Sequence, residues 1–269
     1  MKPHKRYVLA SLLEGSEALG QLGGADDLEE DIATCPLQTI DSAFRQYLPL
    51  EGRILEAGAG RGRWVFHLRR LGYDIQGIEL AGSEVRFAKT FDPSAPLIVG
   101  NVLKTSFPDH SFAAIISLGV LEHFEEGPQE ALGEVRRLLA RDGTFLVTVP
   151  TRNLLRFLLI DRMKHLQIFV RRMLGRRLAF EEYRYTRKQF TAILLDAGFT
   201  VVEMVPDDFR PPKNMGLYTD SRFLRSNSRR WELNGAGRML KSFMDLFSPW
   251  LSCSGTLWVC RVRTERASA

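Results

Sequence analysis

From residue 51 onward, short apolar runs rich in β-branched residues alternate with longer segments of mixed polarity. Parallel strands need long crossover connections, which are usually helices, so this alternation predicts a parallel sheet with helices on both faces. We expect strands at 53–57, 75–79, 97–99, 113–117, 143–149, 200–205 and 256–262, and helices at 62–71, 83–90, 129–140, 186–197 and 238–247. The predicted fold class is therefore α/β, with a doubly wound and mostly parallel sheet of seven strands.

The same pattern divides the 269 residues into four parts. Residues 1–50 are expected to form an N-terminal helical extension, and residues 51–150 the ligand-binding core of the sheet. Residues 151–185 interrupt the alternation as a basic, apolar helical insertion. Residues 186–269 complete the sheet and include a basic segment of loops and helices at 207–250.

Charge is distributed unevenly over these parts. The net charge of +5 combines −4 in residues 1–50, −2 in 51–150, +6 in 151–206 and +5 in 207–269. A basic second half indicates an anionic partner for that half. Three scattered cysteines do not suit a disulfide framework, and neither a signal peptide nor a membrane span is apparent. We expect a cytoplasmic protein, with peripheral attachment to a membrane surface as the alternative.

The most informative motif is the glycine loop after the first expected strand, Ile54–Arg63, with the sequence ILEAGAGRGR. Gly58, Gly60 and Gly62 allow sharp turns and leave room for a ligand, while the helix that follows directs its first amides toward it. The spacing is G-x-G-x-G. It is neither the dinucleotide fingerprint, whose third glycine is replaced by Arg63, nor a phosphate-binding P-loop.

Further polar groups follow the neighbouring strands. Glu79 lies 21 residues beyond Gly58, where an acid accepts hydrogen bonds from the vicinal hydroxyls of a ribose. Asn101 follows the third strand and suits either the edge of an adenine or a tight turn. Residues 117–124 follow the fourth strand and place backbone carbonyls beside a glycine. All these positions lie at the carboxyl edge of the predicted sheet, where α/β proteins bind ligands.

Four segments, EAGAGRG, IEL, LGVLEHF and LLARDGTFLVTVP, resemble the ordered motifs of the class I S-adenosylmethionine-dependent methyltransferases, and within them the type 11 group. The resemblance covers residues 51–150 and extends to 187–205. It implies a Rossmann-like fold with S-adenosylmethionine as the cofactor, and Asn101 departs from it by replacing an aspartate. The implied cofactor-binding residues are Glu56, Gly58, Ala59, Gly60, Gly62, Glu79, Leu80, Asn101, Val102, Leu118 and Gly119.

Methyl transfer is an in-line displacement from an activated donor, so the protein must mainly align the reactants in a dry pocket. A general base is needed only when the nucleophile loses a proton. Glu122 and His123 lie at the expected mouth of the site and are the candidate catalytic residues; His123 could also be a substrate contact or a structural hydrogen bonder. Glu56 either binds the amino group of the cofactor or braces the glycine loop. The other histidines show no ligand spacing, so no metal site is predicted.

The insertion holds eight basic residues and one acid between positions 152 and 178, with a helical stripe of apolar residues. Three interpretations remain open: a lid over the active site, an interfacial membrane anchor, or a nucleic-acid contact, which its apolar character disfavours. A large apolar insertion at this point indicates a bulky hydrophobic acceptor.

The leading hypothesis is a methyltransferase that transfers a methyl group to an O, N or C atom of a small or lipid-like acceptor. A non-catalytic protein of this fold, docking a membrane or partner through its basic C-terminal half, is the main alternative. An NAD-dependent oxidoreductase is disfavoured by Arg63.

Overall fold

The computed structural model describes residues 3–9, 25–152, 168, 173–175, 177–227 and 230–263. Most of the insertion predicted at 151–185 lies outside these residues, so its predicted helix and apolar stripe are not described. Within them, no helix is both long and apolar enough to cross a bilayer.

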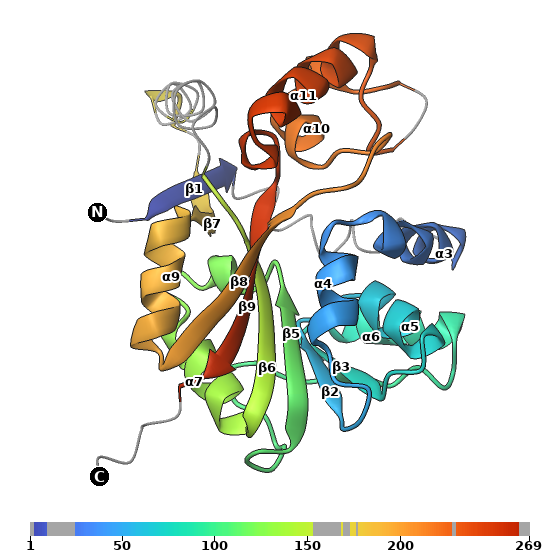
Figure 1. Cartoon of the computed structure of the whole chain (residues 1–269), viewed down its shortest axis with the longest axis vertical. Helices are drawn as coiled ribbons and strands as arrows, with labels where there is room; N and C mark the ends of the chain where they lie inside the picture. The colour runs from blue at the N-terminus through green and yellow to red at the C-terminus, as the bar shows by residue number, and fades with distance from the viewer. Residues whose placement is uncertain are drawn as a thin grey trace.

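A central sheet of seven strands, in the order β4-β3-β2-β5-β6-β9-β8, forms the body of the molecule (Figure 1). The strands are β2 (Ile54–Ala57), β3 (Ile75–Glu79), β4 (Leu97–Val99), β5 (Phe112–Leu118), β6 (Leu139–Pro150), β8 (Phe199–Asp207) and β9 (Gly255–Val262). Only β9 runs antiparallel to its neighbours, β6 and β8. The predicted fold class is confirmed. The strand order reverses between β2 and β5, which is where open α/β sheets bind ligands.

Helices cover both faces of this sheet (Figure 1). One face carries α3 (Ala25–Thr34), α4 (Ile40–Tyr47), α5 (Arg63–Arg70) and α6 (Gly82–Phe91), and the other carries α7 (Gln129–Leu138) and α9 (Arg187–Asp196). Each face has its own apolar core. Phe44 and Trp64 meet edge to face at 4.8 Å in the first, and Phe190 and Trp258 lie 4.8 Å apart in the second. Burial on both faces explains the continuous apolar runs of the strands.

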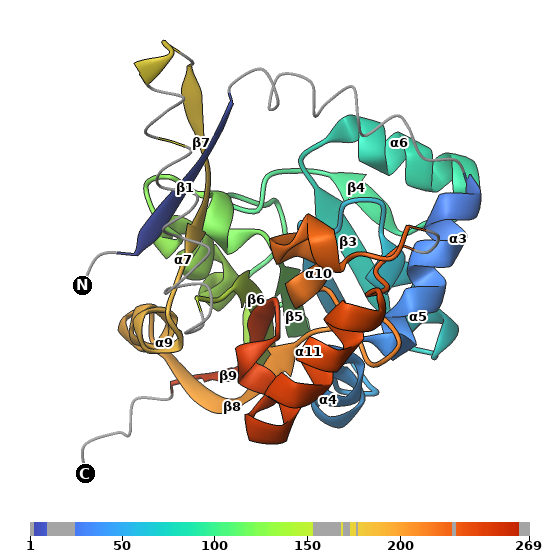
Figure 2. The ribbon, with the colours of Figure 1, turned by 90° about the horizontal axis from the view of Figure 1, so that it is seen from above.

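Between β8 and β9 the chain leaves the sheet and builds a small cap subdomain, residues 208–254, over the carboxyl ends of the strands (Figures 1 and 2). It contains α10 (Gly216–Asp220), the 3-10 turns Arg222–Leu224 and Pro249–Leu251, and α11 (Gly235–Phe247). Leu217, Leu233 and Met244 form its own core. The predicted mixture of loops and short helices is confirmed.

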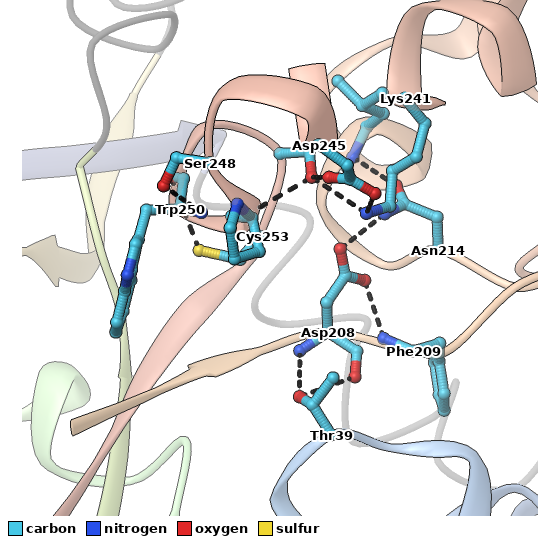
Figure 3. A network of polar contacts seen from close by, with 12 residues as sticks. Thr39, Asp208, Phe209, Asn214, Lys241, Asp245, Ser248, Trp250 and Cys253 are labelled. Carbon is cyan, nitrogen blue, oxygen red and sulfur yellow. Dashed lines mark hydrogen bonds and ion pairs between the residues drawn. The ribbon is translucent and has the colours of Figure 1, made fainter. Parts of the chain in front are cut away.

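A network of buried polar groups fastens the cap to the sheet (Figure 3). Asp208 accepts hydrogen bonds from the backbone amides of Phe209 and Met215 and from the side chain of Asn214. Its own amide donates to Thr39 Oγ1, at the start of α4. One aspartate therefore ties the end of β8, the first turn of the cap and the α4 helix together.

The helical prediction is wrong at the N-terminus. Strand β1 (His4–Leu9) pairs antiparallel with β7 (Leu178–Arg184), so both the start of the chain and the end of the insertion form a two-stranded sheet. Arg6 faces Glu182 in this register, with its Nη1 2.9 Å from the carboxylate Oε1. The pairing joins segments that are far apart in the sequence, and local periodicity carries no information on such contacts.

Candidate active site

The glycine loop connects β2 to α5 through three residues with positive φ angles: +82° at Gly58, +54° at Gly60 and +80° at Gly62. A Cβ on Gly58 would lie 2.4 Å from Val120 Cγ2, and one on Gly62 would lie 2.9 Å from Leu97 Cδ1. A Cβ on Gly60 would meet no atom within 4 Å. Gly58 and Gly62 thus let the loop pack closely against the protein, whereas Gly60 faces open space.

Glu79, at the end of β3, holds this loop in place. Its Oε2 accepts a hydrogen bond from the amide of Gly60 and its Oε1 accepts one from the amide of Ala81, both at 2.9 Å. Each carboxylate oxygen can accept a second hydrogen bond. The side chain is therefore positioned by the backbone and can still bind two adjacent hydroxyls, as the sequence predicts.

Two cavities open on either side of the glycine loop and share Gly58 and Gly60. The first, the loop cavity, has a volume of about 280 Å³ and includes the predicted residues Glu56, Ala59 and Leu118. The second, the strand-end cavity, has a volume of about 300 Å³. Its lining includes the predicted residues Glu79, Leu80, Asn101, Val102, Gly119 and His123. The structure thus brings every predicted cofactor residue except Gly62 to one of the two cavities.

Gly62 serves a different purpose, since it is the N-cap of α5 and packs on Leu97. Asn101 also has a structural task, because its Oδ1 accepts the amide of Leu103 at 2.9 Å and closes a turn. Asn101 thus forms the turn that is one of its two predicted roles, and it also lines the strand-end cavity, where the other role, a contact with the edge of an adenine, stays a prediction.

Several residues of these cavities are not among the predicted cofactor-binding residues, although Val120 and Phe124 belong to the segment 117–124 that the sequence places at this edge. The loop cavity is also lined by Leu28, Asp31, Arg61, Arg63 and Trp64. The strand-end cavity is also lined by Val120 and Phe124. Arg61, Arg63 and Trp64 follow the glycines directly, and adjacency to the motif could have identified them. Leu28 and Asp31 come from α3, and no local signal connects that helix with the loop.

Glu56 lies beneath the loop cavity and is 3% exposed. Among the described residues, its Oε2 has no hydrogen-bond partner. Burial raises the pKa of Glu56 to about 8, although the guanidinium of Arg63 acts in the opposite direction. A buried carboxyl with one unpartnered oxygen matches an ammonium group placed in the loop cavity.

A third cavity of about 250 Å³, which we call the acceptor cavity, lies beyond the ends of β5 and β6. Gly119 lines both this cavity and the strand-end cavity, so the two adjoin at that residue. Its lining includes six polar side chains from the β1–β7 sheet, the 3-10 turn after β5, the end of β8 and the cap: Arg6, Glu182, Arg184, Glu122, Asp207 and Thr219. Only Glu122 among these six is predicted from the sequence, because the others reach the cavity through contacts between segments far apart in the chain.

Glu122 is the most unusual group of the acceptor cavity. It is 3% exposed, and its Oε2 has no hydrogen-bond partner among the described residues. Burial raises its pKa to about 8, and the charges of Glu182 and Asp207 add to the effect. Burial also raises the pKa of Asp207 to about 6. Two carboxyls that resist ionisation therefore face one small space.

Glu182 differs from both, because two guanidinium groups balance its charge. Arg6 Nη1 and Arg184 Nε lie 2.9 and 3.0 Å from its Oε1, and Arg184 also pairs with Asp220 at 3.7 Å. Burial acts to raise the pKa of Glu182, but the two arginines outweigh it and the pKa is lowered. Glu182 stays ionised, while Glu122 is the group able to exchange a proton near neutral pH.

His123 is exposed and lines the strand-end cavity instead of the acceptor cavity. Its Nδ1 lies 2.8 Å from the carbonyl oxygen of Glu181, which fixes Nδ1 as the protonated nitrogen. Glu122, His123 and Glu182 each bring one potential metal-binding atom within 4.8 Å of the others. One of these three groups is already engaged, since Glu182 pairs with Arg6 and Arg184.

Comparisons with known proteins agree with this geometry. Residues 55–147 match the family model described as a methyltransferase domain, which spans β2 to β6 and contains the glycine loop, Glu79 and Glu122. A search of curated proteins finds no match. Over residues 55–147 the chain is therefore similar to the class I methyltransferases of the type 11 group, and the solved structures of this fold include S-adenosylmethionine-dependent methyltransferases.

Solved structures share the fold at low sequence identity. A methyltransferase from Haloferax volcanii, in complex with the Trm112 activator, is 16% identical, with a TM-score of 0.60 and coverage of 96% of this chain and 99% of that one. The [4+2]-cyclase SpnF is 16% identical, with a TM-score of 0.55 and coverage of 84% and 80%. Geranyl diphosphate C-methyltransferase from Streptomyces coelicolor is 16% identical, with a TM-score of 0.50 and coverage of 80% and 75%. One of these relatives is a cyclase, so the reaction must be argued from the site and not from the fold.

Proposed function

We propose that this protein methylates a hydroxyl or amino group on a small molecule or on the polar head of a lipid-like molecule bound in the acceptor cavity. The observation that carries the proposal is Glu122. Its buried, unpartnered carboxyl lies in a cavity that adjoins the cofactor side at Gly119. A carboxyl in that setting suits removal of a proton from an incoming nucleophile.

The chain supplies the groups that would hold the cofactor. Glu79 offers both carboxylate oxygens to the ribose hydroxyls, and Glu56 offers its unpartnered oxygen to the amino group. Gly60 leaves open space where a side chain would stand. When bound, S-adenosylmethionine supplies a methyl group on a positively charged sulfur, so no further activation of the donor is needed.

The remaining residues prepare the acceptor. Arg6 and Arg184 keep Glu182 ionised, which leaves Glu122 and Asp207 as the proton-exchanging groups of the cavity. Glu122 accepts the proton of the nucleophile and positions its oxygen or nitrogen next to Gly119. Met215 and Thr219 of the cap line the cavity and limit the access of water.

Two supports favour a lipid-like acceptor. The second half of the chain carries the basic excess, and a relative of this fold acts on geranyl diphosphate, a molecule with an anionic head and an isoprenoid chain. A non-catalytic protein that binds the cofactor and docks a partner is the competing function. Both the methyltransferase and the non-catalytic protein should bind the cofactor, but only the methyltransferase should convert an acceptor to product.

The experiment combines calorimetry with turnover. Cofactor-stripped protein should bind S-adenosylmethionine, and Glu79→Ala should weaken the binding by about 10-fold or more, because it removes charge-assisted hydrogen bonds. Methyl transfer is then measured on a panel of phenols, amines and lipids with polar heads. Glu122→Gln should keep cofactor binding but lower kcat by about 10²–10⁴-fold. Glu130→Gln, an exposed change in the first turn of α7, is the matched control.

Each outcome has a distinct meaning. Absence of cofactor binding would contradict the assignment of the site. Binding with no turnover on any acceptor would favour the non-catalytic function, and full turnover by Glu122→Gln would remove Glu122 from the mechanism.

A further inference from the structure

Helix α11 exposes a continuous apolar face on the outside of the cap. Four large apolar side chains of this helix are exposed: Met239 (76%), Phe243 (58%), Leu246 (82%) and Phe247 (70%). Their spacing of four, three and one residues places them on one side of the helix. Phe243 and Phe247 meet edge to face at 5.2 Å, so the two exposed rings form a single surface.

The opposite side of α11 is already occupied. Gly237 and Met244 are buried there and pack into the core of the cap. The exposed residues are therefore not needed to hold the helix on the cap. Soluble proteins rarely present large apolar side chains in such a contiguous row unless the row binds something.

The cap that carries this face is basic. Residues 211–250 contain seven basic and three acidic residues, a net charge of +4. Part of this charge is balanced within the protein, because Lys241 pairs with Asp245 at 2.6 Å and Arg230 pairs with Asp31 at 3.1 Å. Asp220 lies 3.7 Å from Arg184. Arg222 and Arg238 are exposed, and Arg222 precedes Phe223, which is 91% exposed. The surroundings of the apolar face thus favour an anionic partner.

We propose that the exposed face of α11, together with Phe223, Arg222 and Arg238, docks the protein on an anionic phospholipid surface. The apolar side chains enter the boundary between headgroups and acyl chains, and the guanidinium groups bind the phosphates. Charge complementarity argues for a lipid surface over a second copy of the chain, because two copies would bring the same arginines together.

The position of the helix connects this surface with the acceptor cavity. The same cap supplies Met215 and Thr219 to the lining of that cavity, and α10 and α11 lie over the carboxyl ends of the strands (Figure 2). Docking through α11 would therefore hold the acceptor cavity next to the lipid. This last step rests on the proposed function, whereas the docking itself does not.

The test is co-sedimentation of the full-length protein with vesicles of phosphatidylcholine alone and with vesicles in which phosphatidylglycerol replaces part of it. Wild-type protein should bind the anionic vesicles at least about tenfold more tightly, because each arginine near such a surface adds attraction. Leu246→Gln should weaken binding several-fold, and the double variant Phe243→Gln/Phe247→Gln should abolish it. Leu50→Gln is the matched control, since Leu50 is 81% exposed and lies before β2, away from the cap.

Calorimetry with S-adenosylmethionine on every variant shows whether the core remains folded, and it separates failure of docking from failure of the proposed function. Equal binding to both vesicle types, binding to neither, or full binding by the double variant would overturn the proposal. Concentration-dependent dimers that disappear in the double variant would overturn it too, and would assign the face to a second copy of the chain.

Discussion

At the scale of single residues, the glycines of the chain separate into those that the backbone requires and those that it merely tolerates. Gly58 has a φ of +82° and no room for a Cβ beside Val120. We expect Gly58→Ala to lower the free energy of unfolding by about 2–4 kcal/mol, because it combines left-handed strain with overpacking. It should also weaken cofactor binding, since the loop must shift. Urea denaturation and calorimetry measure the two effects.

The control is Gly133→Ala in the middle of α7. A Cβ there meets no atom within 4 Å. Alanine has the higher helix propensity, so this variant should gain about 0.5–1 kcal/mol. A Gly58→Ala protein as stable as wild type would show that the loop relaxes freely and is not a rigid cradle.

The second prediction for a single residue concerns Glu122 and the pH dependence of activity. Burial raises its pKa to about 8, so the carboxyl accepts a proton from the nucleophile only after it has lost its own. The specificity constant kcat/KM should therefore rise with pH, with its midpoint near pH 8, and level off above that pH. The residual activity of the Glu122→Gln variant should not show this increase of kcat/KM near pH 8. A wild-type profile that is flat between pH 6 and 9 would contradict the role of Glu122.

At the scale of elements, the sequence predicted those that follow from local pattern. The strands at 75–79 and 97–99 have the predicted bounds, and the others differ at their ends. Strand β1 was missed because its only partner, β7, is about 170 residues further along the chain, and a six-residue run of mixed polarity fits a helix equally well. The same reason separates the predicted from the unpredicted site residues. Glu79 and Glu122 follow strands of the motif, whereas Arg6 and Arg184 reach the acceptor cavity through that long-range pairing.

The attachment of the cap is the element-scale feature that mutation can test. Asp208 receives two backbone amides and the Asn214 side chain in a buried position (Figure 3). Asp208→Ala leaves these donors unsatisfied and should lower the free energy of unfolding by about 2–4 kcal/mol. Limited proteolysis should then cut first within residues 208–254. Asp196→Ala, an exposed change at the end of α9, should stay within about 0.5 kcal/mol of wild type. Unchanged proteolysis in Asp208→Ala would show that the apolar contacts of the cap suffice.

At the scale of the whole molecule, one part of the protein carries family motifs and another part, around the acceptor cavity, carries none. The family motifs lie in β2 to β6, and they fix the fold and the cofactor. The acceptor cavity is lined largely by β1, β7, the end of β8 and the cap, which carry no such motif. This division explains why sequence analysis identified the cofactor and left the acceptor open: the cofactor contacts are local to strand ends, and the acceptor contacts depend on tertiary packing.

The buried carboxyls give the whole molecule a characteristic dependence on pH. Burial raises the pKa of Glu56 and Glu122 to about 8, of Asp208 to about 7 and of Asp207 to about 6. Between the ordinary carboxyl pKa and these values, the folded protein holds protons that the unfolded chain has released. The free energy of unfolding should therefore fall as pH rises from about 5 to 9, by up to about 1.4 kcal/mol per pH unit for each titrating group. Urea unfolding of cofactor-free protein across this range measures the slope.

The double variant Glu56→Gln/Glu122→Gln should have a shallower slope of unfolding free energy against pH between about pH 5 and 8, because neither glutamine titrates. The control variant Glu130→Gln should not change the slope. An unchanged slope in the double variant would mean that these two carboxyls ionise in the folded protein as readily as they do in water.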